Sequence, residues 1–174
     1  MSGIDRQIEN AEDIDLSGAD IKAITNNQVR IISYHELANI SSIDDLLGEN
    51  RAVILLYETK QNFGHWTALF SIDDNTIEFF DSYGFAPDEE LKYATYDDQP
   101  YLSNLMNASN YKFLHNKTRL QTFAHDINTC GRWTALRVKM RDTPLSEFIK
   151  LFKENKHYQP DFWVSAITYL FRGN

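Results

Sequence analysis

The sequence predicts a single domain of the α+β class, and three observations support this prediction. First, 43% of the 174 residues are hydrophobic and 24% are charged, which is the composition of a globular domain with a core. Second, apolar strand-like runs gather in the middle of the chain and helix-like patterns lie at both ends, which favours α+β. Third, no run of about 18 apolar residues occurs, so no membrane-spanning helix is expected.

The N-terminal region predicts a leader followed by short helices. Residues 1–16 are polar and acidic, which favours an acidic flexible leader ahead of one domain that spans residues 17–174. Ser17 is a suitable N-cap for a short helix over 19–25, because its side chain can accept from free backbone N–H groups. Residues 41–48 predict another short helix, with serine at its start and glycine at its end.

Three strands are predicted next, over residues 52–57, 64–72 and 76–81. The first is continuously apolar and bounded by polar residues, as expected for a buried strand. The second alternates between two faces, one of which is apolar. The loop to the third strand is the tight run Asp73–Asn75, which predicts a hairpin.

The second half of the chain predicts irregular structure and then helices. Residues 87–110 are rich in Asp, Asn and Tyr, and one helix is predicted among them. The last third shows apolar residues at helical spacing. The predicted elements are a helix over 101–106, strands over 111–115 and 119–123, and helices over 131–140, from Pro144 onward and over 161–171.

Charge and cysteine content exclude several classes of function. The net charge is −8, and residues 1–20 alone carry −5, so the remaining 154 residues carry only −3. This balance is a poor electrostatic match for nucleic acid. The single cysteine, Cys130, excludes an internal disulfide framework and a zinc site built on Cys-x-x-Cys pairs.

Cys130 is the first candidate for catalysis. A helix that starts at Gly131 would place the thiol at a helix N-terminus, where backbone N–H groups favour the thiolate. His65 is the candidate base, because an imidazole can take the thiol proton and later protonate a leaving amine. His125 is a weaker candidate base, since its loop-like segment has no strand to fix it. A lone cysteine is otherwise most often a small buried apolar residue.

Asp81 is the candidate group that orients the imidazole. If the hairpin loop has three residues, Thr67 faces Asp81, and His65 lies diagonally beside it on the same face. A two-residue loop would place the two side chains on opposite faces. For the oxyanion of an acyl-transfer reaction, chemistry alone leaves Gln121 and Asn128 as alternative amide donors.

Taken together, these residues resemble a known family. The chain contains, in this order, a His-Trp pair, an aromatic strand that ends in Asp, a single Gln and a Cys-Gly pair. This order is similar to that of the adenain and ubiquitin-like-protein protease group of cysteine proteases. The pattern looks most like the maturation proteases of virophages, polinton-like elements and large DNA viruses, over about residues 17–172. The Gln lies nine residues before the Cys, farther than in the better-known members. The matching pieces are Gly64-His65-Trp66, Phe79-Phe80-Asp81-Ser82-Tyr83-Gly84, Gln121 and Thr129-Cys130-Gly131-Arg132-Trp133.

The resemblance implies a fold, an activity and a site. The fold would be a central mixed β-sheet packed against helices, as in adenain-like cysteine proteases. The activity would be that of a cysteine endopeptidase that cleaves capsid or virion precursors during maturation, at Gly-rich sites of small residues. His65, Asp81 and Cys130 would be catalytic, and Gln121 would bind the oxyanion.

Four residues are candidates for contact with the substrate. Aromatic walls would narrow the cleft and favour small residues in the substrate, although aromatic side chains equally suit a core. These candidates are Trp66, Tyr83, Gly84 and Trp133.

The mechanism implied by the resemblance needs no metal or organic cofactor. The expected partners are viral precursor polypeptides as substrates, without a membrane and without strong dependence on DNA, given the acidic balance. We expect a monomer that acts in the host cytoplasm or viral factory and in the virion, and that is not secreted. Two alternatives stay open: an isopeptidase that removes ubiquitin-like modifiers, and an inactive virion structural or binding protein of the same fold.

Overall fold

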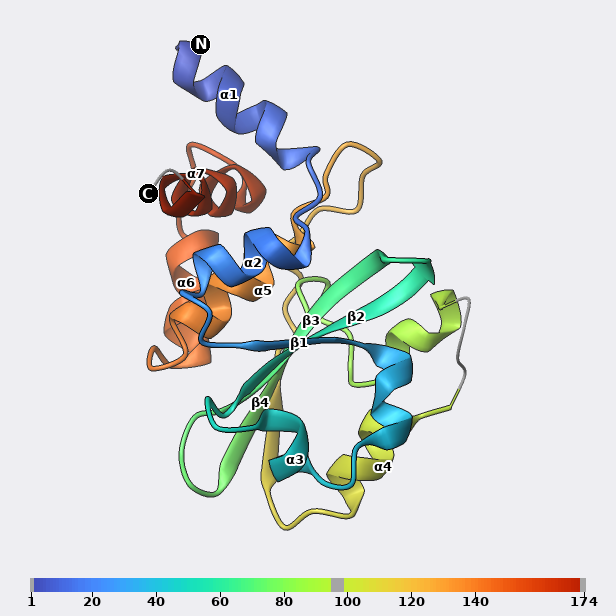
Figure 1. The fold of residues 1–174 in the computed structure, drawn as a ribbon. Coiled ribbons are helices and arrows are strands. Elements are labelled where there is room, and N and C mark those ends of the chain that lie inside the picture. The colour runs from blue at the N-terminus through green and yellow to red at the C-terminus, as the bar shows by residue number, and fades with distance from the viewer. Residues whose placement is uncertain (1, 95–98, 173–174) are drawn as a thin grey trace.

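A single five-stranded mixed sheet organises the protein, for which a computed structural model describes residues 2–94 and 99–172 (Figure 1). The strand order is β1-β2-β3-β4-β5. The outer pairs β1–β2 and β4–β5 are parallel, whereas β2, β3 and β4 form an antiparallel meander. The strands are β1 (Arg30–Ser33), β2 (Ala52–Lys60), β3 (Phe63–Ser71), β4 (Thr76–Phe80) and β5 (Lys112–His115).

Helices cover both faces of this sheet, so the predicted α+β class with a mixed sheet is confirmed. One face carries α2, α5, α6 and α7, and the other carries η1, α3 and α4 (Figure 1). No helix among the described residues has the length and apolar character needed to cross a membrane. The helices are α1 (Gly3–Glu12), α2 (Gly18–Ile24), η1 (Tyr34–Asn39), α3 (Ile43–Leu47), η2 (Glu89–Tyr93), α4 (Tyr101–Asn107), α5 (Cys130–Lys139), α6 (Leu145–Lys153) and α7 (Pro160–Arg172).

The alternation of side chains along the strands builds one hydrophobic cluster on each face of the sheet. On β3, Trp66, Ala68 and Phe70 point into the cluster beneath α5, while Leu69 points into the opposite cluster. This is the period-two pattern expected of a strand whose two faces are both covered. The strand β3 and the helix α5 pack directly on each other beneath this cluster.

The helix α5 lies deep in the molecule, and a buried ion pair ties it to the sheet. All residues from Cys130 to Val138 are buried. Arg137 donates from Nε and Nη2 to the two carboxylate oxygens of Glu78 on β4, at 2.8 and 2.9 Å. Both side chains are shielded from solvent, so this two-point contact fixes the rotation of α5 against β4.

The predicted flexible leader is wrong for most of its length, because residues 3–12 form the helix α1. Ser2 caps it: its hydroxyl accepts from the Asp5 N–H, and the Asp5 carboxylate accepts from the Ser2 N–H. Ile8 and Ala11 are buried where α1 packs along α7 (Figure 1). An amphipathic face and a capping box therefore outweigh the acidic composition.

Two further predictions need correction. The strand expected over 119–123 does not form; instead the backbone N–H groups of Leu120 and Gln121 both donate to the carbonyl of Ser82, which anchors a loop. Pro144 is the N-cap of α6 and not its first residue, which is Leu145. The other predicted elements are confirmed to within a few residues at their ends.

Candidate active site

The β3–β4 hairpin brings His65 and Asp81 together. Its register pairs Ala68 with Phe80, which places Thr67 opposite Asp81 and confirms the register predicted from a three-residue loop. His65 is then the diagonal neighbour of Asp81 on the same face. Its Nε2 lies 3.1 Å from Asp81 Oδ2, and both side chains are buried. Since an ionised carboxylate only accepts, this bond keeps the proton on Nε2.

Asp81 and Tyr83 hold the imidazole in one orientation. The second carboxylate oxygen of Asp81 accepts from the Tyr83 N–H at 2.7 Å, and the Asp81 carbonyl accepts from the Asn116 side chain at 2.9 Å. The Tyr83 ring stacks on the His65 ring, with centroids 4.8 Å apart and planes 16° apart. Tyr83 therefore fixes both the carboxylate and the plane of the ring that it orients.

Cys130 is the first residue of α5 and faces the same imidazole. Asp81 occupies Nε2 of His65, so the other ring nitrogen, Nδ1, is left for the interaction with the Cys130 side chain. The first N–H groups of a helix have no partner within the helix, and Cys130 lies at this end of α5. The structure thus brings together the three residues predicted to be catalytic.

Glycines beside His65 and Cys130 are required by close packing. A Cβ on Gly64 would lie 1.9 Å from the carbonyl oxygen of Tyr57, so β2 and β3 could not pair as they do. A Cβ on Gly131 would lie 3.1 Å from Leu16 and 3.2 Å from Trp66. Glycine is therefore a steric requirement at position 64, and at position 131 it allows the tight contact with Leu16 and Trp66.

A buried carboxylate on α7 anchors the start of α5. Asp161 accepts from the Thr129 hydroxyl and from the Trp133 indole N–H through the same oxygen, Oδ1. Its other oxygen accepts from the Thr122 N–H at 2.8 Å. The residue before Cys130 and the loop that leads to it are thus both tied to α7.

The environment of His65 favours its protonated form. Burial alone would lower the pKa of the imidazole, but the charge of Asp81, its hydrogen bond and the interaction with Cys130 raise that pKa well above its usual value. An imidazolium beside a thiol stabilises the thiolate.

A second carboxylate, that of Glu90 on η2, lies beside the same ring. Its Oε1 is 3.7 Å from His65 Nε2, and the side chain is 7% exposed. Burial, with a contribution from the charge of Asp81, raises the pKa of Glu90 to about 7, although the charge of His65 opposes this shift. Glu90 could not be predicted as a site residue, because its segment has neither motif nor periodicity.

The two candidate oxyanion donors are held differently. Gln121 lines the cleft with Cys130; its Oε1 accepts from the Ser82 hydroxyl at 2.7 Å and its Nε2 donates to the Ile127 carbonyl at 3.2 Å. That bond uses one of the two N–H groups of the amide. The Asn128 amide donates to two oxygens of Asp13, at 3.0 and 3.2 Å.

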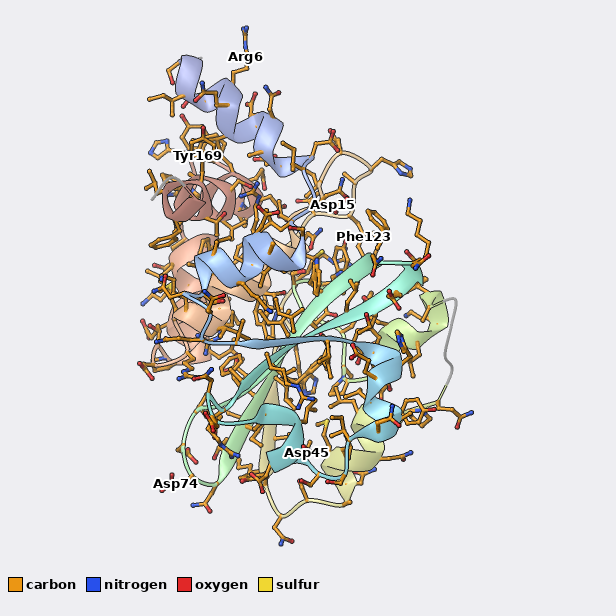
Figure 2. The ribbon with its side chains drawn as sticks, viewed as in Figure 1. Arg6, Asp15, Asp45, Asp74, Phe123 and Tyr169 are labelled. Atoms are coloured by element: carbon orange, nitrogen blue, oxygen red, sulfur yellow. The ribbon has the colours of Figure 1, made fainter. Side chains whose placement is uncertain are left out.

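A cavity of about 230 Å³ opens in front of these side chains. Asp15, which precedes α2, and Phe123, in the loop before α5, both line it and are labelled in Figure 2. Phe63, Tyr83 and Tyr93 add aromatic walls, and Tyr83 stacks on Phe123 with ring centroids 4.2 Å apart. The cleft therefore has an aromatic lining, as predicted, but from partly different residues.

Of the four predicted substrate contacts, only Tyr83 lines this cavity. Trp133 is fully buried, and its ring contacts Phe148 and Phe152 of α6. The Trp66 indole is also buried, and its N–H donates to the Leu16 carbonyl. Both side chains therefore belong to the core. Gly84 packs against the backbone of Lys117. The predictions for Trp66 and Trp133 are wrong, because both indoles serve the core behind the cleft. Gly84 lies outside this cavity, and its contact with substrate stays a prediction.

His125 does not compete with His65 as a base, because it is exposed and does not line the cavity. His65, Asp81 and Glu90 each offer one possible metal-ligand atom, and these atoms lie within 4.8 Å of one another. A cation there would have to displace the proton that His65 Nε2 donates to Asp81. The arrangement that the structure shows is the hydrogen-bonded pair.

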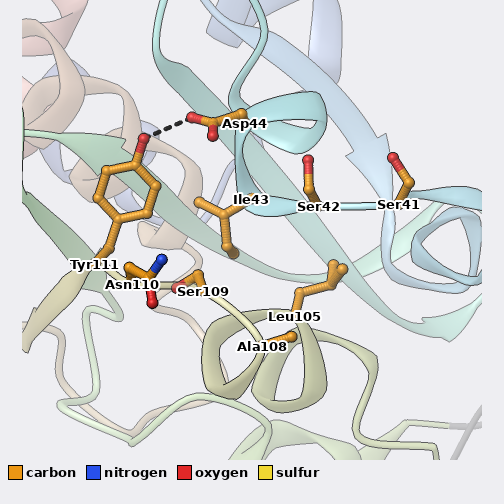
Figure 3. Close-up of a pocket in the computed structure, with 9 residues that line it drawn as sticks. All are labelled: Ser41, Ser42, Ile43, Asp44, Leu105, Ala108, Ser109, Asn110 and Tyr111. Carbon is orange, nitrogen blue, oxygen red and sulfur yellow. Dashed lines mark hydrogen bonds between the residues drawn. The ribbon is translucent and has the colours of Figure 1, made fainter.

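A separate cavity of about 360 Å³ lies between α3 and α4, on the opposite face of the sheet (Figure 3). The Tyr111 hydroxyl donates to Asp44 at its edge, at 2.6 Å. Its lining contains no histidine and no cysteine. The cleft at Cys130 is therefore the better candidate for chemistry.

Comparison with known proteins gives one relative of similar length. The chain is 38% identical over 173 residues to the uncharacterized protein V9 of Sputnik virophage, covering 94% of this chain and 99% of that protein. No protein-family model matches. The central domain of the uncharacterized Lpg1148 protein of Legionella pneumophila matches 91% of this chain and 96% of that domain, with a TM-score of 0.45 and 15% identity.

Proposed function

The chain belongs to the family of the virophage protein V9, and from the site that it carries we propose that it is a cysteine endopeptidase that cleaves viral precursor proteins. One observation carries this proposal: His65 lies between a buried carboxylate, Asp81, and a thiol at a helix N-terminus, Cys130. This is the arrangement of nucleophile, base and orienting acid that covalent hydrolysis of an amide requires.

The proposed reaction starts with transfer of the Cys130 proton to Nδ1 of His65. The thiolate attacks the scissile carbonyl carbon, and the oxyanion accepts from N–H groups at the start of α5 and from Gln121. The imidazolium then protonates the leaving amine. Water, activated by the same imidazole, releases the acyl group and restores the thiol.

The shape of the cleft supports small residues on the acyl side of the cleaved bond. Phe63, Tyr83 and Phe123 line the same cavity as Cys130, and such aromatic walls favour small side chains next to the scissile bond. A glycine-rich segment passes between such walls with the least steric cost. The relationship to a virophage protein supports capsid or virion precursors as the natural substrates.

A labelling experiment tests the reaction class. The purified protein is treated with an electrophilic peptide probe that ends in Gly-Gly, and we expect one label at Cys130. The variant Cys130→Ala serves as a control that keeps the fold, and it should take no label. No labelling of the wild type, with Cys130 reduced, would contradict a cysteine peptidase.

A substrate panel tests the substrate class. The wild type is incubated with capsid precursors from its own virus and with fusions of ubiquitin-like proteins. We expect cleavage of the precursors and none by Cys130→Ala. Cleavage of the fusions alone would instead show an isopeptidase, and probe labelling without any cleavage would count against both substrate classes.

A further inference from the structure

Glu90 is buried beside His65, and the catalytic steps described above do not use it. Its Oε1 atom is shielded from solvent and has no hydrogen-bond partner among the described residues. Buried carboxylate oxygens in native proteins are nearly always bonded, so an unpartnered one needs an explanation. The ring nitrogen Nε2 of His65 lies 3.7 Å from this oxygen, just outside hydrogen-bond distance.

The segment that carries Glu90 is firmly anchored, so the short distance is built into the fold. Asp88, directly before η2, accepts from the hydroxyls of Tyr34 and Tyr57 at 2.7 and 3.1 Å and from the Ser103 N–H at 2.8 Å. These partners come from η1, β2 and α4. Glu90 therefore projects into the cleft from a fixed turn.

We propose that Glu90 is a positioning residue: a second acceptor for the Nε2 proton of His65, which takes over when the imidazole turns away from Asp81. Nε2–H is one donor facing two carboxylates, at 3.1 Å to Asp81 and 3.7 Å to Glu90. A small rotation of the ring exchanges the two bonds. In either orientation the proton stays on Nε2, which leaves Nδ1 free as the base for Cys130.

The charged groups around Glu90 fit this role. From β3 it faces His65, and from the end of β4 it faces Asp81; on its own turn the neighbouring charges are those of Glu89 and Lys92. Above the raised pKa of Glu90, about 7, two anions lie beside one imidazole, and together they stabilise the imidazolium more than one anion does. Only the expected change in kcat/KM rests on the proposed peptidase activity. The expected change in the pKa of His65 needs no substrate.

The first test measures the imidazole itself and needs no activity. In the Cys130→Ala background, the His65 ring is titrated by NMR with and without Glu90→Gln. We expect Glu90→Gln to lower the pKa of His65, because an anion is lost. Glu89→Gln is the matched control: it removes the same charge from the same turn, but Glu89 is exposed and pairs with Lys92, so the titration should not move. An unchanged titration in Glu90→Gln overturns the proposal.

The second test measures redundancy in an active protein. If Glu90 replaces Asp81 as acceptor, the effect of Asp81→Asn should depend on Glu90. We expect Asp81→Asn to lower kcat/KM by about 10²-fold when Glu90 is present and by about 10⁴-fold in the Glu90→Gln background. The larger factor is typical of an imidazole that has lost its orienting acid. Equal losses in both backgrounds overturn the proposal. If no substrate is cleaved by the wild type, the proposed function fails, while the titration still decides the role of Glu90.

Discussion

At the scale of single residues, the side chains around Cys130 differ in what they contribute, because only some of them touch the reacting atoms. In the proposed reaction His65 exchanges protons with Cys130, whereas Asp81, which is fully buried and bonded to the ring, would act through it. Tyr83 contacts both and exchanges no proton in the proposed reaction. Removing each of these groups should therefore give a different loss.

The first prediction separates the base from its orienting acid. His65→Ala should lose nearly all peptidase activity, while Asp81→Asn should lose less, because Asp81 only orients and stabilises the imidazolium. Both variants are assayed by kcat/KM on one peptide and by circular dichroism for folding. An active His65→Ala together with an inactive His125→Ala would show that the base is assigned wrongly.

The second prediction concerns the oxyanion donor. Gln121 should act in the transition state, so Gln121→Ala should lower kcat by about 10²–10³ with KM nearly unchanged. Alkylation of Cys130 by iodoacetamide should be preserved, because that reaction forms no oxyanion.

Asn128→Ala is the matched control for Gln121→Ala, since both amides line the cleft. The Asn128 amide donates to Asp13, so its removal should loosen the segment before α2 and spare kcat. A selective loss of kcat in Asn128→Ala, with Gln121→Ala unaffected, would assign the oxyanion to Asn128.

At the scale of secondary-structure elements, the position of α5 depends on the ion pair between Arg137 and Glu78. The third prediction is that Arg137→Ala costs about 3–5 kcal/mol of unfolding free energy, because it leaves the Glu78 carboxylate buried without a partner. Urea denaturation measures the change. Lys150→Ala, which breaks an exposed pair with Glu154 on α6, should cost less than about 1 kcal/mol. Equal losses for the two variants would contradict this account.

The helix α1 supplies the fourth prediction. Ile8 is buried against α7, whereas Ile4 on the same helix is 68% exposed. Ile8→Ala should therefore cost about 1–3 kcal/mol of unfolding free energy, and Ile4→Ala should cost almost nothing. If α1 does not dock in solution, thermal denaturation will show no difference between the two variants.

The hairpin and the start of α5 could be predicted from the sequence because their signals are local. A three-residue loop fixes the register of β3 and β4, and this register alone places Asp81 beside His65. Gly131, directly after the cysteine, indicates that other side chains, those of Leu16 and Trp66, approach the start of α5 closely. The capping pair Ser2 and Asp5 is a local signal as well, although the acidic composition around it favours a flexible leader.

The remaining features depend on contacts that are distant in the sequence. Glu90 reaches the site only because Asp88 is anchored to Tyr34 and Tyr57, which are more than 30 residues away. Trp133 is expected in the cleft only as an aromatic wall, and the sequence cannot correct this, because α5 is buried on all sides and shows no polar face. Periodicity carries no information for such a helix.

At the scale of the whole molecule, two carboxyl groups make stability depend on pH. Burial raises the pKa of Glu90 from 4.5 to about 7, and burial together with the charge of Asp161 raises the pKa of Glu12 to about 7. Each group binds its proton more tightly in the folded state. The stability that this proton contributes is complete below about pH 4.5 and is lost as the pH rises through about 7.

The fifth prediction follows from this sign. The unfolding free energy of the wild type should fall between pH 5 and pH 8, and Glu90→Gln should remove about 1–3 kcal/mol of that fall. Glu12→Gln should remove less, because Glu12 is partly solvated and its charge is screened. Urea denaturation at several pH values gives the curve; an equal fall in Glu90→Gln and wild type would contradict the prediction.

The order of the strands also sets the order in which the site can be assembled during folding. His65 and Asp81 belong to one hairpin, so their contact closes a short loop and can form early. Cys130 joins them only after almost fifty further residues have been added and α5 has docked. On the ribosome, a nascent chain that has exposed the hairpin therefore holds an oriented imidazole without a nucleophile. If the proposed activity holds, a chain that emerges in this order cannot cleave neighbouring chains until α5 has docked.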